Sequence, residues 1–349
     1  MNRILVVNVN WLGDVIFSIP VFKALRSRYP QAKISCLAVP RVKAILESCP
    51  FLDEIITYDE KGRHFAPWGK WQIITQLRKR RFDAVFLLHG SWTRALLVFL
   101  SGIPERVGYN TKGRKGLLTH IIPAASEKIH RSDYYLRVIE SYGVPVSDRR
   151  YETAVASPIK AEATALLADN GINSPDYLIL INTGGNWDLK RWPRENFAAL
   201  IAQLMDLVPN TFKMKIALPG SNEDLGLAKE IARLSQREPI ILAGKTNLPQ
   251  LLALMQRANL VISADSGPLH MASSVGTTTI ALFGPTRPEN TGPRGPGTTK
   301  ILQHDVGCNR ASCYYLDCPD NICMQAISVE EVVEEVQRIM KQWPSIIPK

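Results

Sequence analysis

A lone carboxylate stands in the first strand-to-helix turn that the sequence predicts. The apolar run Ile4–Val7 is followed by "NVNWLGDVIFSIP", residues 8–20, in which Asp14 is the single acid. Gly13 permits a tight turn and a close approach of a ligand to the backbone. Asp is also a preferred residue at the N-terminus of a helix. The motif is therefore either a plain helix cap or a carboxylate that does chemistry.

A second stretch combines glycines with cations just after another apolar run. It reads "NTGGNWDLKRWPRENF", residues 182–197, and places Lys190 and Arg191 directly before Trp192 and Pro193. Pro suits the first turn of a helix. Free backbone N–H groups beside a cation are typical of a phosphate-binding loop, although a solvated basic loop has the same composition.

A third stretch has the character of a diphosphate site. In "ISADSGPLHMASSVG", residues 262–276, a strand ends and the polar turn Asp265, Ser266 and Gly267 precedes a helix. The hydroxyl group and the N-terminal amides of that helix suit a diphosphate. His270 follows on the helix, where a lone histidine is more often structural than catalytic.

These motifs need strands to position them. Short apolar runs alternate with helix-length amphipathic stretches, which predicts an α/β fold with parallel sheets. We expect a linker within 150–175 and two doubly wound units, with ligands bound beyond the carboxyl ends of the strands. The expected strands are Ile4–Val7, Ile34–Ala38, Glu54–Thr57, Ala84–Leu88, Tyr177–Asn182, Met214–Leu218, Pro239–Leu242, Leu260–Ser263 and Thr278–Leu282.

The chain of 349 residues is basic, with a net charge of +10. Such a charge favours an anionic partner, although a merely solubilising surface would explain it equally well. Cations alternate with aromatic residues in "KGRHFAPWGKWQIITQLRKRRF", residues 61–82. The sequence has no recognisable nucleic-acid module, so we expect an acidic lipid or glycolipid and no nucleic acid. It also lacks a signal-peptide pattern and any apolar run of about 20 residues that could span a bilayer, so we expect a cytoplasmic protein.

Together, the motifs resemble those of the ADP-heptose:lipopolysaccharide heptosyltransferases, a family with the GT-B fold. The resemblance covers essentially the whole chain, and the "NWLGD" context is most similar to the heptosyltransferase II branch. The sequence departs from the pattern of some members, which carry lysine in place of Asn8 and small hydroxyl residues in place of Asn10 and Trp11. The motifs that carry the resemblance are Gly13-Asp14, Lys190-Arg191-Trp192-Pro193, Asp265-Ser266-Gly267-Pro268-Leu269-His270 and Leu282-Phe283-Gly284-Pro285-Thr286.

The resemblance implies transfer of a heptose from ADP-heptose to a lipopolysaccharide inner-core acceptor, with inversion at the anomeric carbon. It implies that Asp14 is the base and that Lys190 neutralises the leaving diphosphate. Glu223 is a candidate for the nucleotide ribose, or simply a solvent-exposed loop acid. The implied donor-binding residues are Gly13, Thr183, Gly184, Lys190, Glu223, Asp265, Ser266, Gly267 and His270. The implied acceptor-binding residues are Asn10, Trp11, Arg63 and Arg94.

The resemblance also implies the domain organisation. Residues 1–160 would form an acceptor-binding Rossmann-like domain that faces a nucleotide-sugar-binding domain, residues 161–327, across a cleft. A helix and tail, residues 328–349, would cross back to the first domain. The protein would be cytoplasmic and peripherally associated with the inner membrane. The rival functions are a GT-B transferase with another nucleotide sugar and a non-catalytic nucleotide-sugar-binding protein.

Metal chemistry is not expected at the reaction centre. The chain has no Asp-x-Asp pair that would hold a divalent metal on a diphosphate, so we expect catalysis without a cofactor. Cysteines nevertheless recur at a spacing of five residues near the end of the second domain. A structural metal, a disulfide and plain structural thiols all remain open for this cluster, which should hold a loop in place. Its members are Cys308, Cys313, Cys318 and Cys323.

Overall fold

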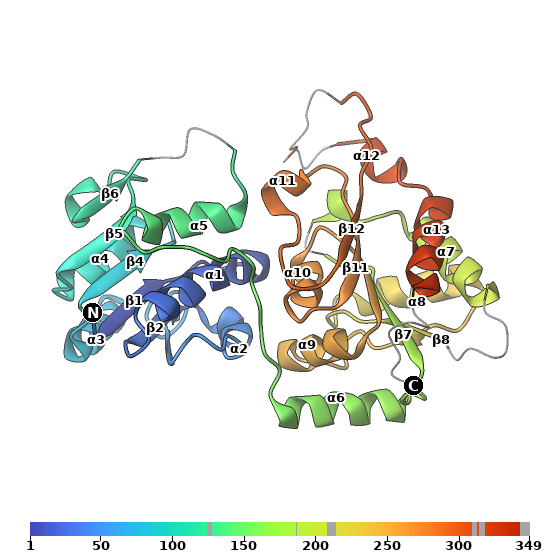
Figure 1. Ribbon diagram of the computed structural model, residues 1–349, viewed down its shortest axis with the longest axis horizontal. Coiled ribbons are helices and arrows are strands. Elements are labelled where there is room, and N and C mark those ends of the chain that lie inside the picture. Colours follow the sequence, from blue (N-terminus) through green and yellow to red (C-terminus); the bar gives the residue numbers. More distant parts are fainter. Residues whose placement is uncertain (124–127, 186, 208–213, 309–312, 314–317, 343–349) are drawn as a thin grey trace. The chain divides into compact units, whose positions relative to one another are not determined.

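The computed structural model describes residues 1–123, 128–185, 187–207, 214–308, 313 and 318–342. The chain divides into two compact units, Met1–Ala154 and Val155–Lys349 (Figure 1). The division lies within the segment 150–175 in which a linker is expected, and a few residues before the expected boundary at residue 160. No helix within the described ranges has both the length and the apolar character that crossing a bilayer requires.

The first unit is built on a six-stranded sheet with the strand order β3-β2-β1-β4-β5-β6. All of its strand pairs are parallel, and Ile4 of the central strand lies opposite Ile34 on one side and Ala84 on the other. The elements are β1 (Arg3–Val7), α1 (Leu12–Arg28), β2 (Lys33–Ala38), η1 (Pro40–Val42), α2 (Lys43–Leu46), β3 (Glu54–Thr57), α3 (Pro67–Arg80), β4 (Ala84–Leu87), α4 (Trp92–Leu100), β5 (Glu105–Tyr109), η2 (Lys115–Leu117), β6 (His120–Ile122) and α5 (Arg131–Glu140).

The second unit repeats this topology. Its parallel sheet has the order β12-β11-β10-β7-β8-β9, which becomes the order of the first sheet when its strands are counted from β7. The elements are α6 (Ser157–Asp169), β7 (Tyr177–Asn182), η3 (Asp188–Lys190), α7 (Arg194–Asp206), β8 (Met214–Leu218), α8 (Leu225–Ser235), β9 (Ile240–Ile241), α9 (Leu248–Arg257), β10 (Leu260–Ala264), α10 (Gly267–Ser274), β11 (Thr278–Leu282), α11 (Pro288–Thr291), β12 (Thr299–Leu302), α12 (Ile322–Gln325) and α13 (Val329–Lys341).

The strand order fixes where ligands bind. In each sheet the chain leaves the central strand in one direction and later returns to its other side, which is the doubly wound Rossmann arrangement. The switch lies between β1 and β4 in the first unit and between β7 and β10 in the second. Ligands of such sheets bind at the carboxyl ends of the strands beside the switch. The three sequence motifs follow β1, β7 and β10.

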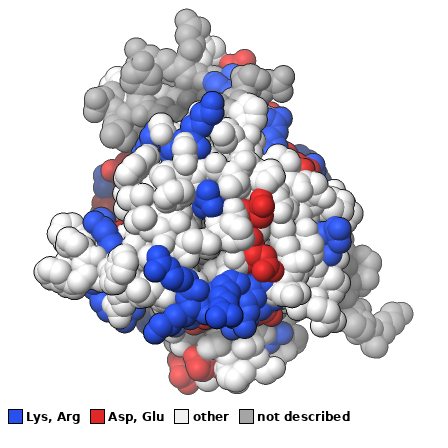
Figure 2. All heavy atoms as spheres, turned by 90° about the vertical axis from the view of Figure 1, so that its left-hand side faces the viewer, with Lys and Arg blue, Asp and Glu red and all other residues white. Residues whose placement is uncertain are grey.

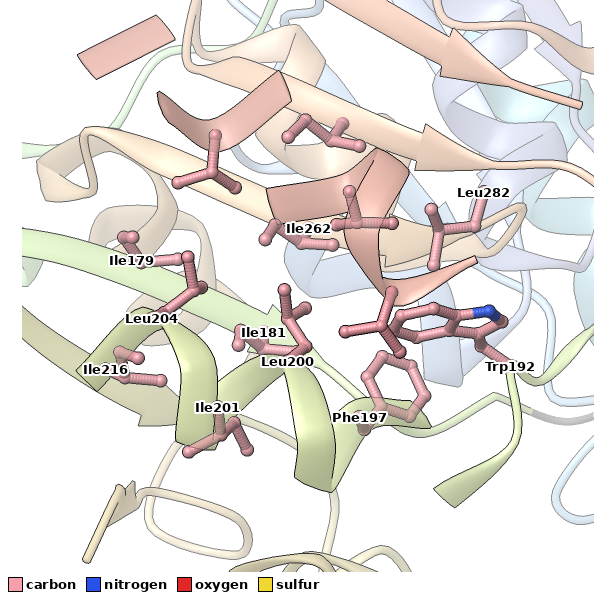
Figure 3. Close-up of a cluster of buried hydrophobic side chains, with 14 of the residues drawn as sticks. Ile179, Ile181, Trp192, Phe197, Leu200, Ile201, Leu204, Ile216, Ile262 and Leu282 are labelled. Atoms are coloured by element: carbon pink, nitrogen blue, oxygen red, sulfur yellow. The ribbon is translucent and has the colours of Figure 1, made fainter. Parts of the chain in front are cut away.

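An apolar core fixes the central strand of the second sheet. Ile179 and Ile181 of β7 are fully buried and belong to the same apolar cluster as Trp192 and Phe197 (Figure 3). The rings of Trp192 and Phe197 meet edge to face, with centroids 5.2 Å apart. The Trp192 Nε1–H donates to the Ile327 carbonyl oxygen at 2.9 Å, so the buried indole has its polar atom satisfied.

Helix α13 contributes to this core. Ser328 caps its N-terminus by accepting from the Glu331 amide. The apolar side of the helix, which includes Val332 and Val336, is buried in the same cluster, and α13 packs on α7. The expected crossing of this segment to the first unit stays a prediction, and residues 343–349 lie outside the described part of the chain.

Candidate functional site

Asp14 lies in the first turn of α1, just beyond the carboxyl end of β1. The N-cap position of this helix is occupied by Trp11, whose side chain makes no capping hydrogen bond. The Asp14 side chain instead contacts α5: its Oδ1 accepts from the Tyr135 hydroxyl at 2.8 Å and from Arg131 Nε at 3.0 Å. The interpretation of Asp14 as a plain N-cap is therefore wrong.

The two donors at Asp14 hold fixed protonation states. Burial, and then the nearby Asp14 carboxylate, raise the pKa of Tyr135 well above its ordinary value. Burial opposes the charge of Arg131, but Tyr135 and Asp14 outweigh it and raise the pKa of the guanidinium. At neutral pH the phenol therefore keeps its proton and the guanidinium keeps its charge. Both groups act as permanent donors to one oxygen of Asp14.

In the second unit, Asp265 is the centre of a polar cluster at the ends of β7 and β10. Its Oδ2 accepts from Lys190 Nζ at 2.7 Å and from Thr286 Oγ1 at 2.7 Å, and Thr291 Oγ1 lies 3.2 Å away. His270 Nε2 lies 3.4 Å from its Oδ1. The sequence predicted Asp265, Lys190 and His270 as site residues, and the structure brings all three together.

The charge state of this cluster follows from its contacts. Asp265 is only 5% exposed, and such burial alone would disfavour the ionised form. The hydrogen bond from His270 and the charge of Lys190 outweigh burial and hold the pKa of Asp265 below its ordinary range. The ionised Asp265 therefore fixes the ammonium of Lys190 at the carboxyl end of the sheet.

The loop after β7 comes very close to the start of α8. A Cβ atom on Gly184 would lie 2.3 Å from Asp224 Oδ1, so any larger residue there would displace the Asp224 carboxylate. The preceding Thr183 is buried, and its Oγ1 has no hydrogen-bond partner among the described residues. Glu223, for which a ribose contact and a plain loop acid were both expected, is exposed. Asp224, which the sequence analysis missed, is the carboxylate that meets the glycine loop.

Ser266 and Gly267 lie where the third motif predicted. Ser266 is the N-cap of α10 without a capping side-chain bond, and Gly267 is the first residue of the helix. The Ser266 Oγ lies 3.1 Å from Ser263 Oγ, which accepts from Asn182 Nδ2 at 3.0 Å. A row of small polar groups therefore links the ends of β7 and β10, where an anion would meet the N-terminal amides of α10.

Of the expected acceptor residues, Arg94 and Asn10 form one cluster after β1. Arg94 is 1% exposed and donates to the Asn8 carbonyl at 2.8 Å, to Asn10 Oδ1 at 2.9 Å and to Glu60 Oε2 at 3.0 Å. The two terminal nitrogens of Arg94 therefore contact the protein and position Asn10 and Glu60, while its Nε has no hydrogen-bond partner among the described residues. Its expected contact with the acceptor stays a prediction.

The other two expected acceptor residues are accessible. Trp11 is exposed, with the Arg41 guanidinium 4.2 Å from its ring centroid. Arg63 is also exposed, and its Nε donates to His64 Nε2 at 3.2 Å.

The four clustered cysteines line one cavity of about 330 Å³, together with Gly284, Pro285 and Thr286. Among the described residues, none of the four forms a disulfide bond. Within the described ranges, no group of three or more His, Cys, Asp or Glu side chains is arranged to hold a metal ion, so the structural metal finds no support here. Residues 309–312 and 314–317, between the first three cysteines, lie outside these ranges.

The chain is similar in sequence to known glycosyltransferases. Residues 70–314 match the model of "Glycosyltransferase family 9 (heptosyltransferase)", a range that includes Lys190 and Asp265 but begins after Asp14. The chain is 27% identical over 307 residues to lipopolysaccharide heptosyltransferase 2 of Salmonella typhimurium, covering 83% of this chain and 85% of the relative. It is 29% identical over 284 residues to lipopolysaccharide heptosyltransferase 3 of Escherichia coli, covering 78% and 80%.

Solved structures show the same fold. A family 9 glycosyl transferase from Veillonella parvula has a TM-score of 0.86 and 26% identity, covering 98% of this chain and 97% of its own. The E. coli ADP-heptose lipopolysaccharide heptosyltransferase II has a TM-score of 0.79 and 24% identity, covering 97% and 99%. These likenesses confirm the predicted fold class of two Rossmann-like units, that of the GT-B enzymes.

Proposed function

The chain belongs to glycosyltransferase family 9, the heptosyltransferase family, and we propose that it transfers a heptose from ADP-heptose to the inner core of a lipopolysaccharide precursor. We propose further that the transfer inverts the anomeric centre and needs no metal at the reaction centre. The names of the relatives support the sugar and the acceptor class. The observation that carries the proposal is the cluster of Lys190, Asp265 and His270 at the switch point of the second sheet.

The second unit binds the donor in this proposal. An ammonium has three N–H donors, so the contact of Lys190 with Asp265 leaves donors for a phosphate oxygen. The first turn of α10 adds backbone amides and the positive end of a helix dipole. Both interactions strengthen as negative charge develops on the departing ADP. Thr183, whose hydroxyl group has no hydrogen-bond partner in the described part of the chain, and Asp224 lie at the loop where the rest of the nucleotide would bind.

Asp14 is the base of the proposed reaction. Tyr135 and Arg131 both bind its Oδ1, and among the described residues no hydrogen bond is made to its Oδ2. We assign Oδ2 to the acceptor hydroxyl. A carboxylate is a weak base, but a sugar hydroxyl loses its proton only as the new bond forms. A carboxylate held in the right orientation is then sufficient, and such assistance contributes roughly 10²–10⁴-fold in rate.

The acceptor defines where the protein works. A lipopolysaccharide precursor is anchored in a membrane, so the proposed location is the cytoplasmic face of the inner membrane, with the protein peripherally bound. The basic stretch 61–82 supports this location, because surface attraction contributes about 1 kcal/mol for each cation near an anionic bilayer.

A donor panel tests the proposal. Purified protein is incubated with a deep-truncated lipopolysaccharide acceptor and with ADP-heptose, or with UDP and GDP sugars in its place. We expect release of ADP and a heptose-extended product, with no loss of rate in the presence of a metal chelator. Turnover of a UDP or GDP sugar in preference to ADP-heptose would contradict the proposed donor. Tight donor binding without any turnover would instead indicate a non-catalytic binding protein.

A further inference from the structure

Exposed aromatic residues gather on one side of the first unit. Of the eleven large apolar side chains that are exposed in the described part of the chain, six lie between residues 65 and 100. The most exposed are Trp68 at 77%, Phe65 at 70% and Trp71 at 56%. Large apolar side chains that are exposed together are typical of interaction surfaces. We call it the aromatic face, and its members are Phe65, Trp68, Trp71, Trp92, Phe99 and Leu100.

Two helices carry this face, and arginines join them. Helices α3 and α4 pack against each other. Arg78 of α3 donates to the Leu100 carbonyl oxygen at 2.6 Å, and its guanidinium lies 5.9 Å from the ring centroid of Trp71. The Arg106 guanidinium lies 5.2 Å from the ring of Phe99. Arg78 thus joins Trp71 of α3 to the C-terminal end of α4, where Phe99 and Leu100 lie.

The surroundings of the aromatic face are strongly basic. Residues 61–82 and 91–104 contain no Asp or Glu. Among the ion pairs of the described residues, only that of Arg80 with Glu54 uses a cation of the stretch 61–82. Six further cations therefore keep their charge available, namely Lys61, Arg63, Lys70, Arg78, Lys79 and Arg81. On the side of the first unit that carries α3 and α4, Lys and Arg gather in the lower part of the view, and much of the rest carries no charge (Figure 2).

We propose that the aromatic face docks on an anionic lipid bilayer, with Trp68 and Trp71 inserted at the headgroup level. Tryptophan is enriched at membrane–water interfaces, and basic residues beside it add attraction to acidic headgroups. Protein interfaces also favour Trp and Arg but are depleted in Lys, whereas this surface carries three lysines. The inference deepens the proposed function, on which it rests, because it names the surface by which the enzyme reaches a lipid-borne acceptor.

Vesicle binding tests the surface directly. The probes are phosphatidylcholine vesicles with and without phosphatidylglycerol, and binding is measured by co-sedimentation. The wild-type protein should bind the anionic vesicles and lose most of this binding in high salt. Trp68→Ser/Trp71→Ser should weaken binding about tenfold or more, since each ring loses apolar burial. Lys61→Glu/Lys79→Glu should weaken it about tenfold or more on anionic vesicles alone.

Matched controls lie in the second unit. Lys160→Glu/Lys229→Glu makes the same change in net charge on the exposed sides of α6 and α8. Leu234→Ser removes an exposed apolar group from α8. These controls should bind the anionic vesicles within about twofold of wild type. Equal weakening in the controls and in the α3 variants would overturn the proposal, because binding would then reflect net charge alone.

The proposal and the proposed function fail in different ways. Turnover is measured with a vesicle-borne acceptor and with a water-soluble acceptor fragment, and the ratio of the two should fall in Trp68→Ser/Trp71→Ser. Absence of turnover on both acceptors, with normal vesicle binding, would contradict the proposed function but support the proposed docking surface. Normal turnover, together with vesicle binding that is unchanged in Trp68→Ser/Trp71→Ser, would contradict the proposed docking surface. The docking surface would also be contradicted if the wild-type protein does not bind vesicles and forms a dimer that dissociates in this variant. The aromatic face would then contact a second copy of the chain.

Discussion

Replacement of Asp14 by Asn separates the chemistry of this carboxylate from its structural contacts. Asn keeps an oxygen that accepts from Tyr135 and Arg131, so the link between α1 and α5 persists without its charge. The side chains of Asp14 and Arg131 are 22% and 48% exposed, so solvent screens the pair and its loss costs about 1 kcal/mol of unfolding free energy or less. The loss of the base, in contrast, should lower kcat by roughly 10²–10⁴-fold.

The assay is steady-state release of ADP, with donor affinity from calorimetry and stability from urea unfolding. Asp148→Asn is the control, since Asp148 is 26% exposed and also forms ion pairs, with Lys23 at 2.9 Å and with Arg150 at 3.1 Å. Both variants should lose a similar small amount of stability, and only Asp14→Asn should lose turnover. Donor affinity should stay within about twofold in both. Turnover near wild type in Asp14→Asn would remove Asp14 from the mechanism.

Three further predictions concern the second unit. Lys190→Ala should weaken ADP-heptose binding and slow transfer together, each by about 1.5–3 kcal/mol; unchanged KM and kcat would contradict the role of this cation. Asp265→Asn should lower the unfolding free energy by about 2–4 kcal/mol at neutral pH. The folded-state pKa of Asp265 lies below its ordinary value of 3.8, so its stabilisation is present above pH 4 and is lost as the pH falls further. The gap between wild type and variant in urea unfolding should therefore narrow below pH 4, and a constant gap would argue against an ionised Asp265. Trp192→Phe should cost about 1–3 kcal/mol in the same assay, because the Ile327 carbonyl loses its buried donor; unaltered stability would show that water replaces the indole.

The sequence predicted the motif-bearing strands because strands buried on both faces read as continuous apolar runs. Strands β5, β6 and β12 were missed, since "ERVGY", "HII" and "TKIL" are short or carry charges. Strand β9 contains only Ile240–Ile241 of the expected run.

The partners within the site were less accessible to sequence reasoning. Asp14 and Tyr135 lie 121 residues apart in the sequence, and Lys190 and Asp265 lie 75 residues apart. A local pattern identifies each residue but carries no information on which distant side chain it contacts. Arg94 shows the same limit, because a charged residue on a helix suggests exposure. Only the fold reveals that its buried guanidinium donates to the Asn8 carbonyl oxygen and to the side chains of Asn10 and Glu60.

The contribution of α13 to the second core has a consequence for biosynthesis. Domains generally fold as units while the ribosome works from the N-terminus. The first unit is closed by residue 154, so it can fold while the rest of the chain is being translated. The second unit cannot complete its core before α13 is translated, because Val332, Val333 and Val336 belong to the same cluster as β7. Until residues 329–341 leave the ribosome, that apolar cluster is open to chaperones, and a chain truncated before α13 should be a substrate for proteolytic quality control.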